Sequence, residues 1–313
     1  MTQTRLALSA DFDPELWCLF DQYVHGDIDR RGFLDRATRF AAASGTTAVA
    51  LLAALSPDFA RAQKVPPTDP RLKTEFVEFA SPVGYGKVRA YVARPAAATG
   101  PLPVVLVVHE NRGLNPHIED ITRRLALDNF VAVAPDALFP LGGYPGDEDA
   151  ARALFAKLDQ SKTREDFVAA AQWARSVPGG NGKLGAVGFC FGGGMVNFLA
   201  SRVPELLAGA PFYGAVASAE QAGRIKAELF IVFADNDERI NAGWPAYETA
   251  LKAAGVKHEA VKYPGTQHGF NNDTTPRFDA AAAQQAWSRT AGAVQPHAAL
   301  SGARNAACVQ FCR

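Results

Sequence analysis

The chain has 313 residues, and its 32 Lys and Arg residues are balanced by 32 Asp and Glu residues, so the formal net charge is zero. A balanced charge without a long basic run argues against nucleic acid or an anionic membrane as partner. The length exceeds that of an average domain, yet one α/β domain of roughly 220 residues with extensions at both ends fits it.

The first 62 residues have the features of an export leader. Residues 29–34, Asp-Arg-Arg-Gly-Phe-Leu, resemble a twin-arginine signal, and the moderately apolar segment 40–55 follows them. Ala60-Arg61-Ala62 then matches a cleavage site of the A-x-A type. The apolar segment is too short and too weakly hydrophobic for a convincing membrane span. We therefore predict a leader at residues 1–62, twin-arginine export to the periplasm and no membrane span. The alternative is an N-terminal helix docked onto a cytoplasmic enzyme, because residues 12–17 look like ordinary folded protein.

Eight strand-like runs follow the leader, at residues 75–80, 88–94, 103–108, 130–134, 184–189, 208–213, 229–234 and 258–263. After the first two, they alternate with amphipathic helical stretches, which predicts an α/β fold with a mostly parallel twisted sheet flanked by helices. Functional residues are then expected at the carboxyl ends of the strands.

This α/β domain is predicted to span residues 65–290. A closing helix begins at Ala280, but its pattern stops abruptly at Gly292. We expect residues 291–313, which contain Cys308 and Cys312, to be an irregular tail. An altered reading frame near residue 291 would account for such an end.

The most informative motif is Gly188-Phe189-Cys190-Phe191-Gly192, where an apolar strand runs into a helix that begins near residue 193. This is the pattern of a nucleophile elbow, with a cysteine in the nucleophile position. Glycines two residues before and after the nucleophile allow the tight turn, and the helix N-terminus favours a thiolate. The alternative is a buried cysteine in an ordinary strand-turn-helix.

A nucleophile needs a base and an acid that orients it, and in α/β-hydrolases the chain order is nucleophile, acid, histidine. Asp235 and Asp237 both lie in the loop after the strand at 229–234, and their spacing alone does not separate them. His268 lies in a glycine-flanked loop after the last strand; the alternative is a loop histidine bonded to a backbone carbonyl. His109 is the main competitor for the base, whereas His25 is set aside because it lies in the leader.

Three motifs together resemble the dienelactone hydrolase (carboxymethylenebutenolidase) family: residues 188–193, 109–115 and 264–270. The similarity covers about residues 74 to 290. It implies an α/β-hydrolase fold and a Cys-His-Asp triad at Cys190, His268 and Asp237. Asp237 is preferred because the family acid is followed three residues later by an aliphatic residue, here Ile240. Asp235 lies where relatives tend to have glycine.

The resemblance implies further site residues. Glu110 would hold the resting thiol and take its proton, whereas the alternative is a strand-end carboxylate paired with Arg112. Backbone N–H groups of Asn111 and Phe191 would form the oxyanion hole. The expected reaction is hydrolysis of an ester, enol-lactone or thioester through an acyl-enzyme, without amide hydrolysis.

Relatives bind the carboxylate of dienelactone with arginines, one of them four residues after the catalytic histidine. Asn272 occupies that position here, so the pocket departs from the family pattern. Arg112 and Arg239 are the other substrate-binding candidates, with Arg277 as a further basic residue nearby. Tyr144, in the glycine-rich loop 141–147, could face the substrate from a lid.

Two other function classes are weighed against a hydrolase. A thiol redox sensor would use Cys190 but lacks a nearby resolving cysteine. A non-catalytic binding module on a hydrolase fold is the second alternative, although it would not need a full triad. No metal or cofactor is expected, because His109-Glu110 lacks a second histidine at helical spacing. We expect a small-molecule ester or lactone as partner, and a monomer or small homo-oligomer.

Overall fold

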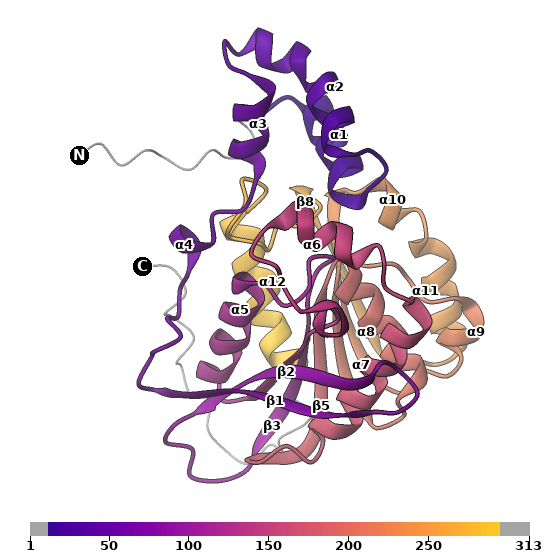
Figure 1. The fold of residues 1–313 in the computed structure, drawn as a ribbon. Helices are drawn as coiled ribbons and strands as arrows, with labels where there is room; N and C mark the ends of the chain where they lie inside the picture. Colours follow the sequence, from indigo (N-terminus) through magenta and orange to yellow (C-terminus); the bar gives the residue numbers. More distant parts are fainter. Residues whose placement is uncertain (1–11, 295–313) are drawn as a thin grey trace.

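The computed structural model describes residues 12–294, and its centre is one eight-stranded sheet in the order β1-β2-β4-β3-β5-β6-β7-β8 (Figure 1). The strands are β1 (Leu72–Ser81), β2 (Gly86–Pro95), β3 (Leu102–Val108), β4 (Val131–Pro135), β5 (Gly180–Phe189), β6 (Leu206–Phe212), β7 (Glu228–Asn236) and β8 (His258–Gln267). β2 pairs antiparallel with both β1 and β4, and the other neighbours are parallel. The predicted fold class is confirmed.

All eight predicted strands are present, and several extend beyond the predicted runs. β5, for example, starts at Gly180 rather than at residue 184, because its first four residues are at least partly exposed and carry no hydrophobic signal. The parallel strands at the centre of the sheet have continuously apolar sequences because helices cover both faces of the sheet. Val104 to Val108 in β3 accordingly have no exposed surface.

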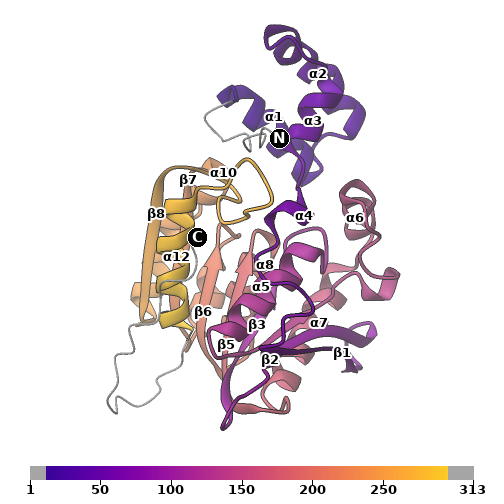
Figure 2. The same cartoon turned by 90° about the vertical axis from the view of Figure 1, so that its left-hand side faces the viewer.

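The helices and the one 3₁₀ turn of the α/β domain are α5 (Pro116–Leu127), η2 (Phe139–Leu141), α6 (Glu148–Phe155), α7 (Gln160–Ala174), α8 (Phe191–Arg202), α9 (Ala219–Ala222), α10 (Glu238–Asn241), α11 (Trp244–Ala253) and α12 (Ala280–Ala293). One face of the sheet packs against α7, α8 and α11, and the other packs against α5 and α12. The result is a three-layer α/β arrangement (Figure 2).

The closing helix differs from its prediction. α12 does not break at Gly292 but continues through it to Ala293, and it buries Ala286 and Trp287 over the sheet. The predicted tail lies almost wholly outside the described residues, and Cys308 and Cys312 lie outside them completely.

Residues 12–62 form a helical unit, here called the cap, above the carboxyl end of the sheet (Figures 1 and 2). Its helices are α1 (Pro14–His25), α2 (Arg30–Ala43), α3 (Ala48–Leu55) and α4 (Phe59–Ala62). The first three share an apolar core that includes Leu16, Phe20, Phe33 and Leu55. Asp29, the first residue of the twin-arginine-like motif, caps α2 by accepting from the Gly32 N–H.

Within the described part of the chain, no single helix is long and apolar enough to cross a membrane. α2 and α3 satisfy the length and composition criteria only when taken together, and they are bent at 99° to each other.

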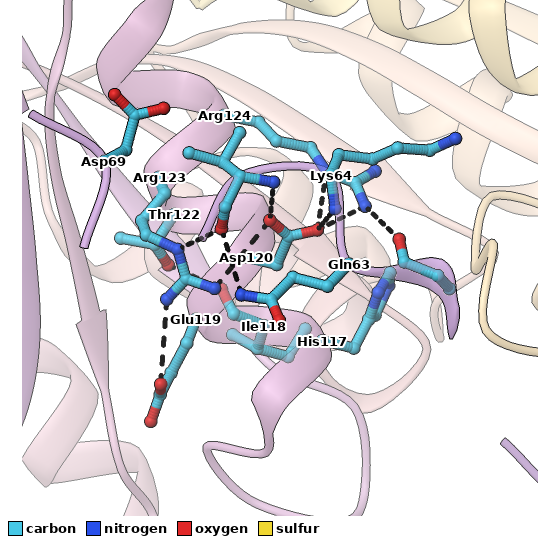
Figure 3. Close-up of polar contacts among 12 residues, drawn as sticks. Gln63, Lys64, Asp69, His117, Ile118, Glu119, Asp120, Thr122, Arg123 and Arg124 are labelled. Carbon is cyan, nitrogen blue, oxygen red and sulfur yellow. Dashed lines mark hydrogen bonds and ion pairs between the residues drawn. The ribbon is translucent and has the colours of Figure 1, made fainter. Parts of the chain in front are cut away.

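The segment that leaves the cap is fixed to α5 by Asp120, which is buried (Figure 3). Its two carboxylate oxygens accept the backbone N–H groups of Val65 at 2.8 Å and Lys64 at 3.1 Å. The same carboxylate accepts from Arg124 Nε at 2.9 Å, and Arg123 Nε donates to the Val65 carbonyl at 2.7 Å. One buried carboxylate therefore anchors the connection between cap and α/β domain.

Candidate active site

The predicted elbow is present between β5 and α8. Cys190 lies between the two elements with φ 55° and ψ −112°, a strained conformation for a residue with a side chain. A Cβ atom on Gly188 would lie 2.2 Å from the Gly192 carbonyl oxygen, and one on Gly192 would lie 2.2 Å from the Val108 carbonyl oxygen. The two glycines are therefore required sterically, and they hold Cys190 at the carboxyl end of the sheet.

The structure distinguishes between the two candidate acids. Asp237 Oδ2 lies 2.6 Å from His268 Nδ1, and both side chains are buried. Asp235 is exposed and accepts the Gly265 N–H at 3.1 Å instead. Because a carboxylate can only accept, the proton of His268 lies on Nδ1 in the neutral ring, and Nε2 has its lone pair free to accept a proton.

His268 Nε2, Cys190 Sγ and the nitrogen of a second histidine lie within 4.8 Å of one another. Burial raises the pKa of the Cys190 thiol, but the positive charge on His268 and hydrogen bonds from the two histidines outweigh burial and hold this pKa well below its usual range. Burial lowers the pKa of His268, but the charge on Cys190 and the hydrogen bond to Asp237 raise it to about 10. This balance favours a thiolate-imidazolium pair.

The second histidine is His25, the last residue of α1 in the cap. Its Nε2 lies 3.8 Å from Cys190 Sγ, and its ring meets the His268 ring edge to face, with centroids 4.9 Å apart. Its Nδ1 donates to the Asp21 carbonyl at 2.8 Å, and Arg239 Nη2 lies 3.0 Å from its Nε2. His25 was set aside as a candidate base because it lies in the predicted leader, but the structure places it next to the thiol. His25 and Cys190 are 165 positions apart in the sequence, and no motif spacing indicates that they are in contact.

Glu110 follows β3 and accepts from Asn272 Nδ2 at 3.0 Å. Burial and the nearby negative charge of Cys190 raise the pKa of Glu110 from its ordinary value of 4.5 to about 7. The alternative prediction, a pair with Arg112, is not what the structure shows, because the Nε of Arg112 lies 3.7 Å from Glu148. Asn272 therefore lies in the site, next to a carboxylate of the protein.

His109, the competing base, is buried away from the thiol. Its Nε2 accepts the Ala137 N–H at 3.1 Å, and burial lowers its pKa. Its ring stacks with Phe191, with centroids 6.0 Å apart. These contacts assign His109 a packing role.

The two predicted oxyanion donors are Phe191 and Asn111. Phe191 is the first residue of α8, so its N–H is one of the groups that a helix leaves free at its N-terminus. Asn111 lines the pocket, and its side chain donates to the Val24 carbonyl of the cap at 3.1 Å.

A cavity of about 330 Å³ opens above Cys190 and His268. Of the predicted substrate-binding residues, Arg112, Tyr144 and Asn272 line it. Arg239 contacts His25 instead, and the Tyr144 hydroxyl donates to Glu148 at 2.9 Å.

Comparison with known proteins agrees with the family resemblance of the three motifs. A family model described as the dienelactone hydrolase family matches residues 88–297, which is more than half of the chain. The chain belongs to this family. Its α/β domain is 34% identical over 215 residues to the "Putative carboxymethylenebutenolidase" of Escherichia coli K12, covering 64% of this chain and 79% of the relative. A shorter relative, "Putative hydrolase fragment YghX" of the same organism, is 49% identical over 113 residues, covering 36% of this chain and 97% of the fragment.

Among solved structures, a "Putative Dienelactone Hydrolase" from Klebsiella pneumoniae is similar with a TM-score of 0.64 and 29% identity, covering 72% of this chain and all of that one. A second family model, described as YqhI-like, matches residues 5–42 and so covers most of α1 and α2. The chain is therefore a dienelactone hydrolase-like hydrolase of the carboxylic ester class on an α/β-hydrolase fold, as the three sequence motifs predicted.

Proposed function

We propose that this hydrolase cleaves carboxylic esters, dienelactone-like enol lactones and thioesters through a Cys190–His268–Asp237 triad and an acyl-enzyme. The observation that carries the proposal is the buried 2.6 Å hydrogen bond between His268 and Asp237, next to Cys190 in its strained backbone conformation. That arrangement orients a base beside a nucleophile, as acyl transfer requires.

The reaction follows from this arrangement in two steps. The Cys190 thiolate attacks the ester carbonyl, and the N–H groups of Phe191 and Asn111 stabilise the oxyanion. The tetrahedral intermediate collapses to a thioester on Cys190, and the leaving alkoxide takes a proton from His268. Neutral His268, held by Asp237, then takes a proton from water as the water attacks the thioester. Collapse of the second intermediate releases the acid and restores the thiolate.

Glu110 supplies a second carboxylate near the thiol. In molecules whose Cys190 still carries its proton, the family resemblance implies that Glu110 takes that proton when substrate arrives. Two observations support this role: Glu110 lines the cavity, and its carboxylate accepts a hydrogen bond from the neutral Asn272 rather than from an arginine. A neutral partner leaves the carboxylate more basic than an arginine would.

Replacing Glu110 with glutamine is expected to lower activity and raise stability at alkaline pH. The pKa of Glu110 is about 7 in the folded protein, so the folded state holds this proton more tightly than the unfolded state. The stability that the neutral Glu110 carboxyl contributes to the folded state is fully present below about pH 4.5 and is lost as the pH rises through about 7. The cost of the buried charge at pH 8 is on the order of 3 kcal/mol.

Urea denaturation at pH 5 and pH 8 checks this prediction. Glu110→Gln should be more stable than the wild type at pH 8 and should differ little from it at pH 5, which serves as an internal control. In kcat/KM for an ester, the wild type should gain activity as the pH rises through about 7, and the variant should lack this rise. A variant less stable than the wild type at pH 8 would contradict the buried, costly carboxylate.

A substrate panel tests the proposed reaction class. It comprises dienelactone, p-nitrophenyl acetate and a thioester, each offered to the full chain and to a His268→Ala variant. Turnover that is lost in the variant supports the triad. If the wild type hydrolyses the simple esters but not dienelactone, the failure to hydrolyse dienelactone would be assigned to the pocket around Asn272. Twin-arginine export and removal of residues 1–62 stay predictions, and removal would take away the cap residues that line the cavity.

A further inference from the structure

The cavity above the thiol is made by two parts of the chain that are distant in sequence. The cap contributes aromatic and aliphatic side chains, among them Phe20, Tyr23 and Phe59. The α/β domain contributes the reacting groups Cys190 and His268. The cap therefore forms the wall that a substrate meets while its carbonyl lies at the thiol.

Specific contacts hold this wall in place on the α/β domain. The Arg277 guanidinium packs over the Phe20 ring at 4.8 Å and pairs with Asp21 at 2.7 Å. The Arg152 guanidinium lies over the Tyr23 ring at 4.1 Å and donates to the Tyr23 carbonyl. Cation-π and ion-pair contacts from α6 and from the loop between β8 and α12 thus fix the aromatic side chains that face the cavity.

The charges around the cavity are already matched within the protein. Among the described residues that line it, each arginine is within 4.0 Å of a carboxylate, in the pairs Arg30–Asp149, Arg112–Glu148 and Arg277–Asp21. Asp147 and Glu110 add further acidic groups to the lining. Arg239 is outside this lining, and its Nη2 lies 3.0 Å from His25 Nε2. A carboxylate on a substrate would therefore meet arginines whose charge is already compensated by carboxylates of the protein, beside the further acidic groups Asp147 and Glu110.

We propose that the cap makes this site selective for small neutral esters whose apolar acyl group lies against Phe20, Tyr23 and Phe59. This inference rests on the ester hydrolysis proposed above and adds the substrate class and the residues that set it. Asp21 is the specificity-determining residue, because its carboxylate compensates the charge of Arg277 and so weakens the attraction of Arg277 for an anionic substrate. A cavity of about 330 Å³ is at the lower end of small-molecule sites and suits short acyl chains.

The first experiment tests charge selection on the full chain. It compares kcat/KM for p-nitrophenyl butyrate with kcat/KM for mono-p-nitrophenyl succinate, two esters of similar length that share a leaving group. The wild type should prefer the neutral ester. Asp21→Asn, which removes the partner of Arg277, should shift the ratio about tenfold towards the succinate, the size expected for one charge-assisted hydrogen bond.

The matched control is Asp27→Asn, because Asp27 is an exposed carboxylate of the same cap and is not part of the cavity wall. It should leave the ratio unchanged. A wild-type preference for the succinate, or an Asp21→Asn ratio equal to that of the wild type, would overturn the inference. An equal gain with both esters would show that the cap only blocks the site and would also overturn it.

The second experiment tests the apolar wall. A fully buried methylene contributes up to about fourfold in kcat/KM, so p-nitrophenyl butyrate should react faster than the acetate. Phe59→Ala should reduce this preference severalfold, whereas Phe76→Ala, at an exposed position on β1 outside the cavity, should not. Equal preferences in the two variants would contradict a role for the cap in binding.

These results separate the two proposals. If the wild type hydrolyses none of the three p-nitrophenyl esters, the proposed function itself fails. If it hydrolyses them in a manner that depends on Cys190 but without the expected selectivity, only the inference about the cap fails.

Discussion

Replacing Cys190 with alanine is expected to lower kcat for ester hydrolysis by at least about 10⁴-fold, the loss typical when a covalent nucleophile is removed. The methyl group of alanine cannot form the thioester, and the imidazolium of His268 loses the thiolate that raises its pKa. The oxyanion donors and the cavity would remain and would leave only a small residual rate.

The matched control for this variant is Cys18→Ala. Cys18 is exposed on α1 and is the other cysteine in the described part of the chain, so this change removes a thiol without touching the elbow. Its kcat should equal that of the wild type. Circular dichroism should show both variants folded. A Cys190→Ala protein that retains kcat within tenfold of the wild type would exclude Cys190 as the nucleophile.

The largest expected loss of stability follows from Asp120→Ala. This change leaves the buried Arg124 without one of its carboxylate partners and leaves the N–H groups of Lys64 and Val65 without an acceptor (Figure 3). Arg124 also pairs with Asp273 at 2.8 Å, so part of its charge stays compensated. Removing one member of a buried ion-pair network costs about 3 to 5 kcal/mol of the free energy of unfolding.

Urea denaturation of Asp120→Ala and Glu119→Ala measures this difference on one helix. Glu119 pairs with Arg123 at 3.7 Å, but its side chain is 28% exposed, so its loss should cost less than about 1 kcal/mol. Equal losses in the two variants would mean that Asp120 does not act as the buried anchor of the segment that leaves the cap.

The fold and the elbow could be predicted because their signals are local. Parallel strands read as apolar runs, and the steric demand of the elbow appears directly as Gly188 and Gly192 around Cys190. The choice between Asp235 and Asp237 was different, since the residues themselves left it open and only the family pattern favoured Asp237. In the structure, the position of Asp237 at the start of α10 brings its carboxylate to His268.

The cap contribution could not be predicted from local patterns. Arg30 illustrates the difficulty, because the same residue belongs to a twin-arginine-like motif and, in the folded chain, forms an ion pair with Asp149 at 2.7 Å. Both uses require a basic residue at this position. Likewise, neither the position of His25 at the thiol nor the pairing of the arginines around the cavity follows from any spacing in the sequence, because both depend on tertiary contacts.

The measurement that tests the central claim most directly is detection of the acyl-enzyme. The full chain is mixed rapidly with p-nitrophenyl acetate, quenched with acid at times spanning the first turnover, and digested for mass spectrometry. The account predicts an initial burst of p-nitrophenolate and one acetyl group on the peptide that contains Cys190. Turnover with the acetyl group on another residue, or with no acetylated peptide at any time, would contradict a thioester mechanism at Cys190.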